Sequence, residues 1–444
     1  MKVLLVRPKF SSPSLQEYPP FSLITLAPYF NSKVSICDLQ TNVMLHHFLD
    51  HDTDLVGFTG FSDQLTEINY LAKVVRKKSN AKIIVGGPAV TASPEHAAAF
   101  LEDVDLLVCG DGEHFAENFG GSLYYPEKIY KSPFYNWEKH RIPTWNLIDY
   151  TRYFKYPGCA VETSRGCPRS CIMCSAHLIC GKKWRPRKPE DVIQEIRCMI
   201  QMYGFKLFYF PDDNATVDPK RWVRLMQLIV QADLNIHLHA PEGLEAHHLD
   251  RDTLLLMKKA GFEHITIGAE SGVQRVLDKV IHKSGLKVEQ IENVVRDCHE
   301  IGLGINCFFI IGTAGETLEE AEETVEFAEK MRRLGAYSCM VRNTIPLPGT
   351  PLFEIAENKG YLTVPPDKLY DSAFIHSGQH LMETPEWTPR QIEVLVQKSQ
   401  MQDARHILKH KKKHMLKKGL VRMFRNPKAA TSRLKHLLAQ AWKT

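Results

Sequence analysis

The chain has 444 residues, of which 44% are hydrophobic and 24% are charged, a composition typical of globular proteins with two or three domains. No apolar run approaches the ~20 residues that span a bilayer, and the apolar start of the chain is too short for a signal peptide. The 11 cysteines show no disulfide framework, which favours a reducing cytoplasm.

The net charge of +5 hides an uneven distribution. Residues 404–444 contain 13 Lys and Arg and no acidic residue, and the remainder carries 43 basic against 51 acidic residues, a net charge of −8. The basic tail is therefore a feature separate from the body of the protein.

The first third of the chain alternates strands and helices. We expect strands over residues 2–6, 33–37, 54–59, 82–85 and 105–109, a helix that begins near Pro20 and another over residues 64–78. This alternation predicts an α/β domain with a doubly wound parallel sheet, flavodoxin-like in type. Such sheets bind ligands at the carboxyl ends of their strands.

A second alternating region follows an aperiodic connector at residues 120–157. Its expected strands are 160–163, 206–210, 235–240, 264–268, 304–311 and 338–344, and its helices are 189–203, 218–232, 250–260, 288–301 and 317–334. These six β/α units place functional residues at the carboxyl ends of the strands.

Residues 164–174, SRGCPRSCIMC, space three cysteines as C-x3-C-x2-C, at Cys167, Cys171 and Cys174. Three thiolates can hold three irons of a [4Fe–4S] cluster, and because full ligation takes four cysteines, one iron stays open to a small molecule. The alternative is a zinc site with Cys180 or His177 as fourth ligand.

The motif resembles the signature of the radical S-adenosylmethionine (SAM) superfamily, whose members fold as a partial (β/α)6 barrel. This resemblance implies that the open iron binds the amino and carboxyl groups of SAM, which an electron from the cluster cleaves to a 5′-deoxyadenosyl radical. It also implies SAM contacts after several strands: Met173, where many members have an aromatic residue, Asp212, Asp213, Glu270, Ser271 and Gly312.

Simpler roles compete at some of these positions. One of the two aspartates after the second strand, Asp212 or Asp213, is expected to cap the following helix. Arg275 and Lys279 lie near the G-x-E-S-G-like segment 268–272 and are equally well explained as solvated helix charges.

The first domain resembles the cobalamin-binding domain that is fused to many radical SAM enzymes. The order of its segments carries this resemblance, which implies cobalamin contacts at Thr59, Ser62, Gly86, Gly87, Gly110 and Gly112. The D-x-H-x-x-G segment that supplies a histidine to cobalt elsewhere is missing. The alternative is a flavodoxin-like domain that has lost its cofactor.

These patterns divide the chain into a cobalamin-binding-like domain at residues 1–125, a linker at 126–157, a radical SAM barrel at 158–355 and C-terminal helices with the basic tail at 356–444. The tail has several interpretations: it covers the open side of the barrel, presents a solvated basic face, lies on an anionic membrane surface or binds nucleic acid. Nucleic acid is the least favoured, because no domain of the tRNA-modifying relatives is recognisable.

The leading hypothesis is a radical SAM enzyme that acts on an unactivated C–H bond, with cobalamin-dependent methylation at carbon as its reaction. The alternatives are radical oxidation or ring closure, as in tetrapyrrole cyclases, and a non-catalytic cobalamin or redox sensor. The expected partners are a small-molecule, lipid, tetrapyrrole or peptide substrate and an external electron donor of the flavodoxin or ferredoxin type. The expected location is cytoplasmic, with peripheral contact at the inner membrane face.

Overall fold

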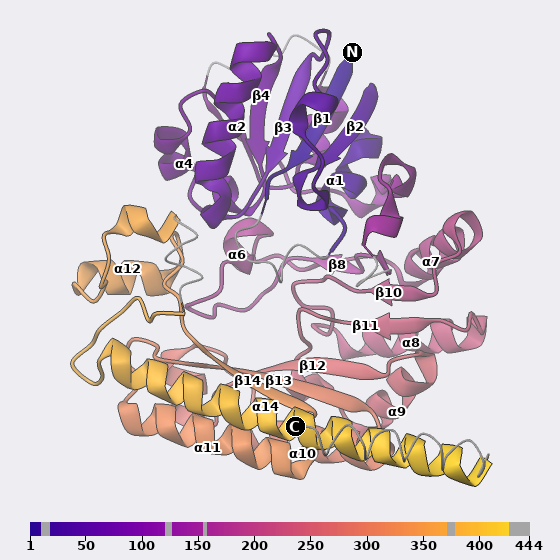
Figure 1. Cartoon of the computed structure of the whole chain (residues 1–444), viewed down its shortest axis with the longest axis vertical. Helices are drawn as coiled ribbons and strands as arrows, with labels where there is room; N and C mark the ends of the chain where they lie inside the picture. Colours follow the sequence, from indigo (N-terminus) through magenta and orange to yellow (C-terminus); the bar gives the residue numbers. More distant parts are fainter. Residues whose placement is uncertain (10–17, 120–126, 154–157, 371–377, 426–444) are drawn as a thin grey trace, which may run out of the picture.

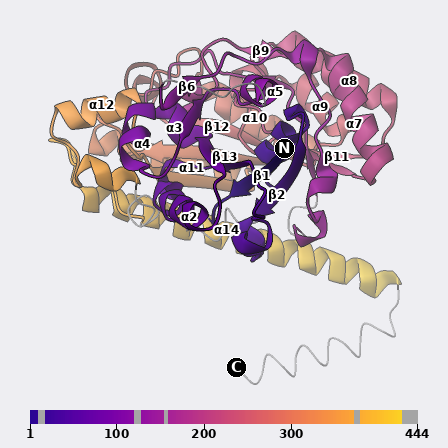
Figure 2. The ribbon, with the colours of Figure 1, turned by 90° about the horizontal axis from the view of Figure 1, so that it is seen from above.

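The computed structural model describes residues 1–9, 18–119, 127–153, 158–370 and 378–425, with side chains described up to residue 409. Two α/β domains face each other, and C-terminal helices lie along the second domain (Figures 1 and 2). The predicted fold class, a doubly wound domain followed by an open barrel and C-terminal helices, is confirmed.

The first domain is built on a parallel sheet in the order β2-β1-β3-β4-β5-β6. Its strands are β1 (Lys2–Arg7), β2 (Lys33–Asp38), β3 (Leu55–Thr59), β4 (Lys82–Gly86), β5 (Leu106–Cys109) and β6 (Ile129–Lys131). The first five match the predicted strands to within one residue at each end. Strand order reverses between β1 and β3, as in flavodoxin-like sheets, where ligands bind beside that reversal.

Helices cover both faces of this sheet, because successive residues of β1 are apolar on both sides. Leu5 belongs to one buried cluster and Leu4 to another, and burial on both faces is typical of parallel sheets. The helices are α1 (Phe21–Leu26), α2 (Leu65–Lys78), α3 (Pro88–Ala92), α4 (Pro94–Phe100) and α5 (Glu113–Asn118).

The strand β6 is a finding that the sequence pattern does not give. It lies inside the segment expected to be an aperiodic connector, and it pairs with β5 through residues 129–131. Three residues are too few for a recognisable alternation of apolar and polar side chains.

The second domain is an open arc of six parallel strands. They are β7 (Cys159–Ala160), β10 (Leu207–Tyr209), β11 (His237–His239), β12 (His264–Glu270), β13 (Gly304–Ile311) and β14 (Ser338–Asn343). They form the sheets β11-β10-β7 and β12-β13-β14, which the parallel bridges Leu238–Phe262 and Leu244–Ile267 connect. Within the described residues β7 and β14 do not pair, so the barrel stays open.

Helices α7 (Pro189–Tyr203), α8 (Pro219–Ala232), α9 (Arg251–Ala260), α10 (Val288–Ile301) and α11 (Leu318–Leu334) surround the arc. Their bounds agree with the predicted helices because capping residues mark several ends. The Asp218 carboxylate caps the start of α8, and glycines in the left-handed region end α7, α9, α10 and α11.

The C-terminal part contains α12 (Pro351–Asn358) and the long helix α14 (Pro389–Arg425). The Asp403 carboxylate accepts hydrogen bonds from Ser338 Oγ (2.6 Å) and Cys339 N (2.7 Å), which fixes α14 against the edge strand β14. The basic tail beyond residue 425 lies outside the described residues. No described helix is long and apolar enough to cross a membrane.

Candidate active site

The three cysteines of the motif border one cavity of about 390 Å³. They lie in the loop between β8 (Ser164–Arg165) and β9 (Arg185–Pro186), whose antiparallel pairing closes the base of the loop. The loop follows β7, so the thiols stand at the carboxyl end of the barrel, where the strand pattern places them. All three are half-buried.

The cysteine geometry argues against zinc. Ligands at about 2.3 Å from a tetrahedral zinc ion lie about 3.8 Å from one another. Among the described residues, three or more Cys, His, Asp or Glu donor atoms lie mutually within 4.8 Å at Glu245, His247 and His248 alone. The three Sγ atoms are therefore spread too widely for one such ion.

The thiols also fit a cationic cluster electrostatically. Burial raises the pKa of the Cys171 thiol to about 12, so a thiolate there needs strong positive charge beside it, as cluster irons provide. Asn214 Nδ2 lies 3.6 Å from Cys167 Sγ and the Ala176 N–H lies 3.4 Å from Cys174 Sγ, and both can donate to a thiolate.

Arg169 ties the cysteine loop to two neighbouring loops. It donates to both carboxylate oxygens of Glu245 (2.6 and 2.9 Å) and to His247 Nε2 (2.8 Å). It also donates to the Ser284 carbonyl (3.0 Å). Because the guanidinium already supplies the positive charge at the Glu245–His247–His248 group, that group is not a convincing metal site.

Three of the six predicted SAM residues border the cysteine cavity: Met173, Asp213 and Glu270. Glu270 has a φ of 62°, a backbone conformation that non-glycine residues rarely adopt and that often marks functional sites. Its carboxylate accepts a hydrogen bond from Lys283 Nζ at 2.7 Å.

The other three predicted residues lie behind the cavity. Asp212 is buried and accepts hydrogen bonds from Thr163 and Ser164. It therefore fixes the start of the cysteine loop and does not cap a helix. Ser271 is buried against Thr324 Oγ1 at 2.9 Å. Gly312 is not among the residues that border the cavity.

Several residues that border the cavity were not predicted: Arg169, Asn214, Glu242, Glu245 and Lys283. Glu242 and Glu245 lie in the loop that follows β11, so the strand-end rule that singled out Asp213 could have found them. Lys283 carries no such signal, because it follows an irregular π-helical turn, η10 (Val276–Val280).

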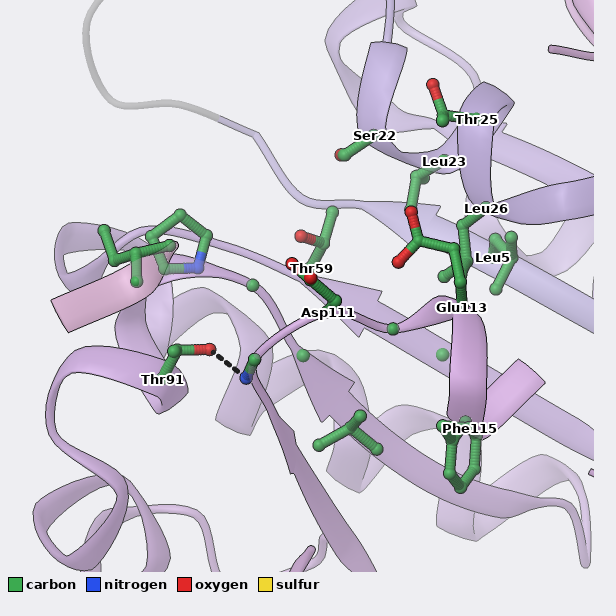
Figure 3. A pocket seen from close by; sticks show the side chains of 18 of the residues that line it. Leu5, Ser22, Leu23, Thr25, Leu26, Thr59, Thr91, Asp111, Glu113 and Phe115 are labelled. Carbon is green, nitrogen blue, oxygen red and sulfur yellow. Dashed lines mark hydrogen bonds between the residues drawn. The ribbon is translucent and has the colours of Figure 1, made fainter. Parts of the chain in front are cut away.

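A second cavity, of about 240 Å³, lies at the carboxyl ends of β1, β3, β4 and β5 (Figure 3). Five of the six residues predicted to contact cobalamin border it: Thr59, Gly86, Gly87, Gly110 and Gly112. Ser62 does not border it and instead begins the short helix η5 (Ser62–Gln64). The Gly110 N–H donates to Thr91 Oγ1 at 3.0 Å.

The lining of this cavity is mostly apolar. Side chains of Leu5, Phe30, Ile84, Val108 and Phe115 line it together with several glycines. A Cβ at Gly87 would lie 2.5 Å from Thr59 Oγ1, so a side chain at this position would clash with the end of β3. None of the described residues around the cavity is a histidine, in agreement with the missing D-x-H-x-x-G segment.

Arg165 joins the two domains between the cavities. Its guanidinium lies 2.7 Å from Glu113 and 3.5 Å from Asp111 of the first domain, and 2.8 Å from Glu162 of the barrel. Arg185 adds a 2.5 Å ion pair with Asp111. Burial is the main reason that the pKa of the Glu113 carboxyl is raised.

Cys180 and Asp213 form a wall that the two cavities share. Cys180 borders the glycine-rich cavity and Asp213 borders the cysteine cavity. Their side chains are hydrogen-bonded to each other, and Asp213 also accepts from the Gly166 N–H at 3.0 Å. Cys180 is therefore hydrogen-bonded to Asp213 and does not border the cavity of the three motif cysteines.

Two family models match this chain, one for each domain. Residues 161–328 match the model of the radical SAM superfamily, and residues 14–119 match the model of the B12 binding domain. The first match contains the cysteine loop and the second contains the predicted glycines.

Two curated relatives and one solved structure illustrate the similarity. An uncharacterized methyltransferase of Pyrococcus horikoshii is 29% identical over 80% of this chain and 83% of its own length. An anaerobic magnesium-protoporphyrin IX monomethyl ester cyclase of Rubrivivax gelatinosus is 23% identical over 74% of this chain and 65% of its own length. The structure of OxsB, a cobalamin-dependent SAM radical enzyme, aligns with a TM-score of 0.68 and 17% identity over 99% of this chain and 75% of its own.

Proposed function

This chain belongs to the radical SAM superfamily and carries a B12 binding domain, and we propose that it transfers a methyl group to an unactivated carbon atom of its substrate. A [4Fe–4S] cluster, SAM and cobalamin are the cofactors of these two families, so the cofactor predictions are confirmed. The same membership supports an enzyme over a non-catalytic sensor.

The residues that bind these groups are proposed from the two cavities. Cys167, Cys171 and Cys174 hold the cluster, and Met173, Asp213 and Glu270 line the space for SAM. The residues proposed to cradle cobalamin are Thr59, Gly86, Gly87, Gly110 and Gly112. When bound, the cluster with SAM supplies a carbon-centred radical and cobalamin supplies a methyl group.

One observation carries this proposal: the two cavities share the Cys180–Asp213 wall. Methylation at carbon requires a radical source and a methyl source that reach the same substrate atom. The carboxyl ends of both sheets face this wall, which supports the proposal that the two binding sites lie next to each other. Arg165 ties the two domains together beside the second cavity through Asp111 and Glu113.

Anaerobic reconstitution of the whole chain tests the cluster assignment. We expect about four irons per chain and release of 5′-deoxyadenosine when reductant and SAM are added. Cys171→Ala should lose both signals, whereas Cys198→Ala, a half-buried cysteine of α7 outside both cavities, should keep them. A Cys171→Ala protein that still cleaves SAM would refute the assignment.

A second reaction, radical oxidation or ring closure without methyl transfer, is favoured by the similarity to the Rubrivivax cyclase. Product analysis distinguishes the two reactions. Methyl transfer forms S-adenosylhomocysteine together with 5′-deoxyadenosine and requires cobalamin, whereas the oxidative reaction forms 5′-deoxyadenosine without S-adenosylhomocysteine.

The enzyme acts on a substrate and needs an electron donor, as radical SAM enzymes do. We propose a small-molecule, lipid, tetrapyrrole or peptide substrate, a flavodoxin- or ferredoxin-type donor and a cytoplasmic location. We also propose that the basic tail, residues 404–444, contacts an anionic membrane surface. Flotation with anionic vesicles should recover the full chain and should fail for a chain that ends at residue 403.

A further inference from the structure

The segment Ile281–Ser284 is attached to the cysteine loop at two points. The Ile172 N–H donates to the Ile281 carbonyl (3.1 Å), and Arg169 Nη1 donates to the Ser284 carbonyl (3.0 Å). His282, inside this segment, has a φ of 63°, a conformation that costs free energy for a non-glycine residue. The segment is therefore held in a defined position beside the cysteines.

This attachment places Lys283 in the wall of the cysteine cavity. Lys283 borders the same cavity as Cys167, Cys171 and Cys174, and its side chain is only 10% exposed. Its ammonium donates to the Gly268 carbonyl (2.8 Å) and to Glu270 Oε1 (2.7 Å). These bonds hold Glu270 in its strained conformation at the end of β12.

The charge on Lys283 is maintained despite burial. Burial alone lowers the pKa of a lysine, but neighbouring negative charge, above all the Glu270 carboxylate 2.7 Å away, outweighs it and the pKa of Lys283 is raised. Lys283 therefore carries its positive charge in the wall of the cavity that the three cysteines border.

The other charges around the cavity are Arg169, Asp213, Glu242 and Glu245. Both carboxylate oxygens of Glu245 accept from Arg169, which also donates to His247 and to the Ser284 carbonyl. Lys283 forms the corresponding pair with Glu270. Lys283 and Glu270 can be substituted one at a time, which removes one positive or one negative charge from the wall of the cavity.

We propose that the positive charge of Lys283 makes the cluster easier to reduce, and that the negative charge of Glu270 partly offsets this effect. The inference rests on the proposed function, because it assumes that the cysteines hold the cluster. Reduction takes one electron from the external donor and adds one negative charge. A buried cation nearby stabilises that charge strongly, because the local dielectric constant is low.

The test is a redox titration of the anaerobically reconstituted full chain, followed by the electron paramagnetic resonance signal of the reduced cluster, without substrate. Lys283→Met should lower the equilibrium constant for reduction about tenfold, which is 59 mV for a one-electron couple. Glu270→Gln should raise it, and the double variant should lie near the wild type. This reciprocity separates a charge effect from loss of structure.

Lys279→Met is the matched control, because it removes the same charge four residues earlier in the chain. Lys279 is exposed, so solvent and salt screen it and the potential should not change. Lys283→Arg keeps the charge and should restore most of the wild-type potential.

The outcomes are distinguishable. A cluster in Lys283→Met with the wild-type midpoint potential would overturn the inference and leave the proposed function intact. If Lys283→Met binds no iron, the Glu270→Gln variant becomes the test. A midpoint potential in Glu270→Gln equal to that of the wild type would also overturn the inference. A wild-type chain that assembles no [4Fe–4S] cluster would instead refute the proposed function.

Discussion

Glu316 is a buried carboxyl group in the turn between β13 and α11. Its Oε2 atom accepts hydrogen bonds from the backbone N–H groups of Gly312 (2.6 Å) and Thr313 (3.0 Å). Burial outweighs these bonds and raises the pKa of Glu316 to about 8. The folded protein therefore favours the protonated acid, which makes Glu316 a test of linkage between folding and pH.

Glu316→Gln should flatten the pH dependence of stability. Because the pKa is higher in the folded state, the wild type loses stability as pH rises from the unfolded value of about 4.5 to about 8, by roughly several kcal/mol. Urea denaturation at pH 5 and pH 8 should show a gain for the variant that grows with pH.

Glu320→Gln is the control of opposite sign. A hydrogen bond from Arg275 is the main reason that the pKa of Glu320 is lowered, so its contribution is lost as pH falls. Equal pH profiles for Glu316→Gln and the wild type would contradict the assignment of a protonated Glu316.

Sequence patterns could identify the chemistry at single residues but not the direction of each side chain. The cysteine spacing predicted the cluster loop, and the structure gathers all three thiols at one cavity. Asp212 and Asp213 looked equivalent, yet one faces inward to Thr163 and Ser164 and the other faces the cavity. Such a difference depends on the turn that follows β10, which no residue in the sequence marks.

Among the elements, the turn after β4 depends most on one residue. Gly87 has a φ of 92°, and a Cβ there would lie 2.5 Å from Thr59 Oγ1 on the neighbouring strand. Both the backbone conformation and the space therefore require glycine.

Gly87→Ala should destabilise the cofactor-free protein by roughly 1–3 kcal/mol, since the substitution adds strain and a clash. Chemical denaturation measures this, and retention of cobalamin during purification should fall with it. Gly86→Ala is the control, because its Cβ would lie 3.5 Å from the nearest atom, the Val108 carbonyl oxygen. Equal stability of the two variants would show that the turn tolerates a side chain.

Strands and helices with a clear apolar period were predictable, and their carboxyl ends located both cavities. Elements without such a period were not. The strand β6 is three residues long, and the β8–β9 hairpin pairs two residues on each side. These short elements exist because neighbouring segments offer hydrogen-bond partners, which is information that lies elsewhere in the chain.

For the molecule as a whole, Arg165 is a polar link between the domains that has several carboxylate partners. It is paired with Asp111, Glu113 and Glu162 in a buried setting. Removing one partner of such a network leaves uncompensated charges away from water.

Arg165→Met should lower the free energy of unfolding by roughly 3–5 kcal/mol, as measured by urea denaturation. Adding Glu113→Gln should recover part of the loss, because it removes one of the unpaired carboxylates. Arg224→Met is the control: its pair with Glu190 is exposed on both sides, worth less than about 1 kcal/mol. An Arg165→Met protein as stable as the wild type would show that the link is dispensable.

The contact between the domains could not be predicted, since each half is a complete pattern by itself. A single apolar core nevertheless runs through both, from Leu5 and Ile24 beside the first sheet to Trp145 and Phe208 at the barrel. One domain consequently cannot be replaced by that of a relative unless the residues of this shared core also match. Substitutions that alter the substrate range have to leave the residues of this shared core matched, whereas the residues that line the two cavities can vary.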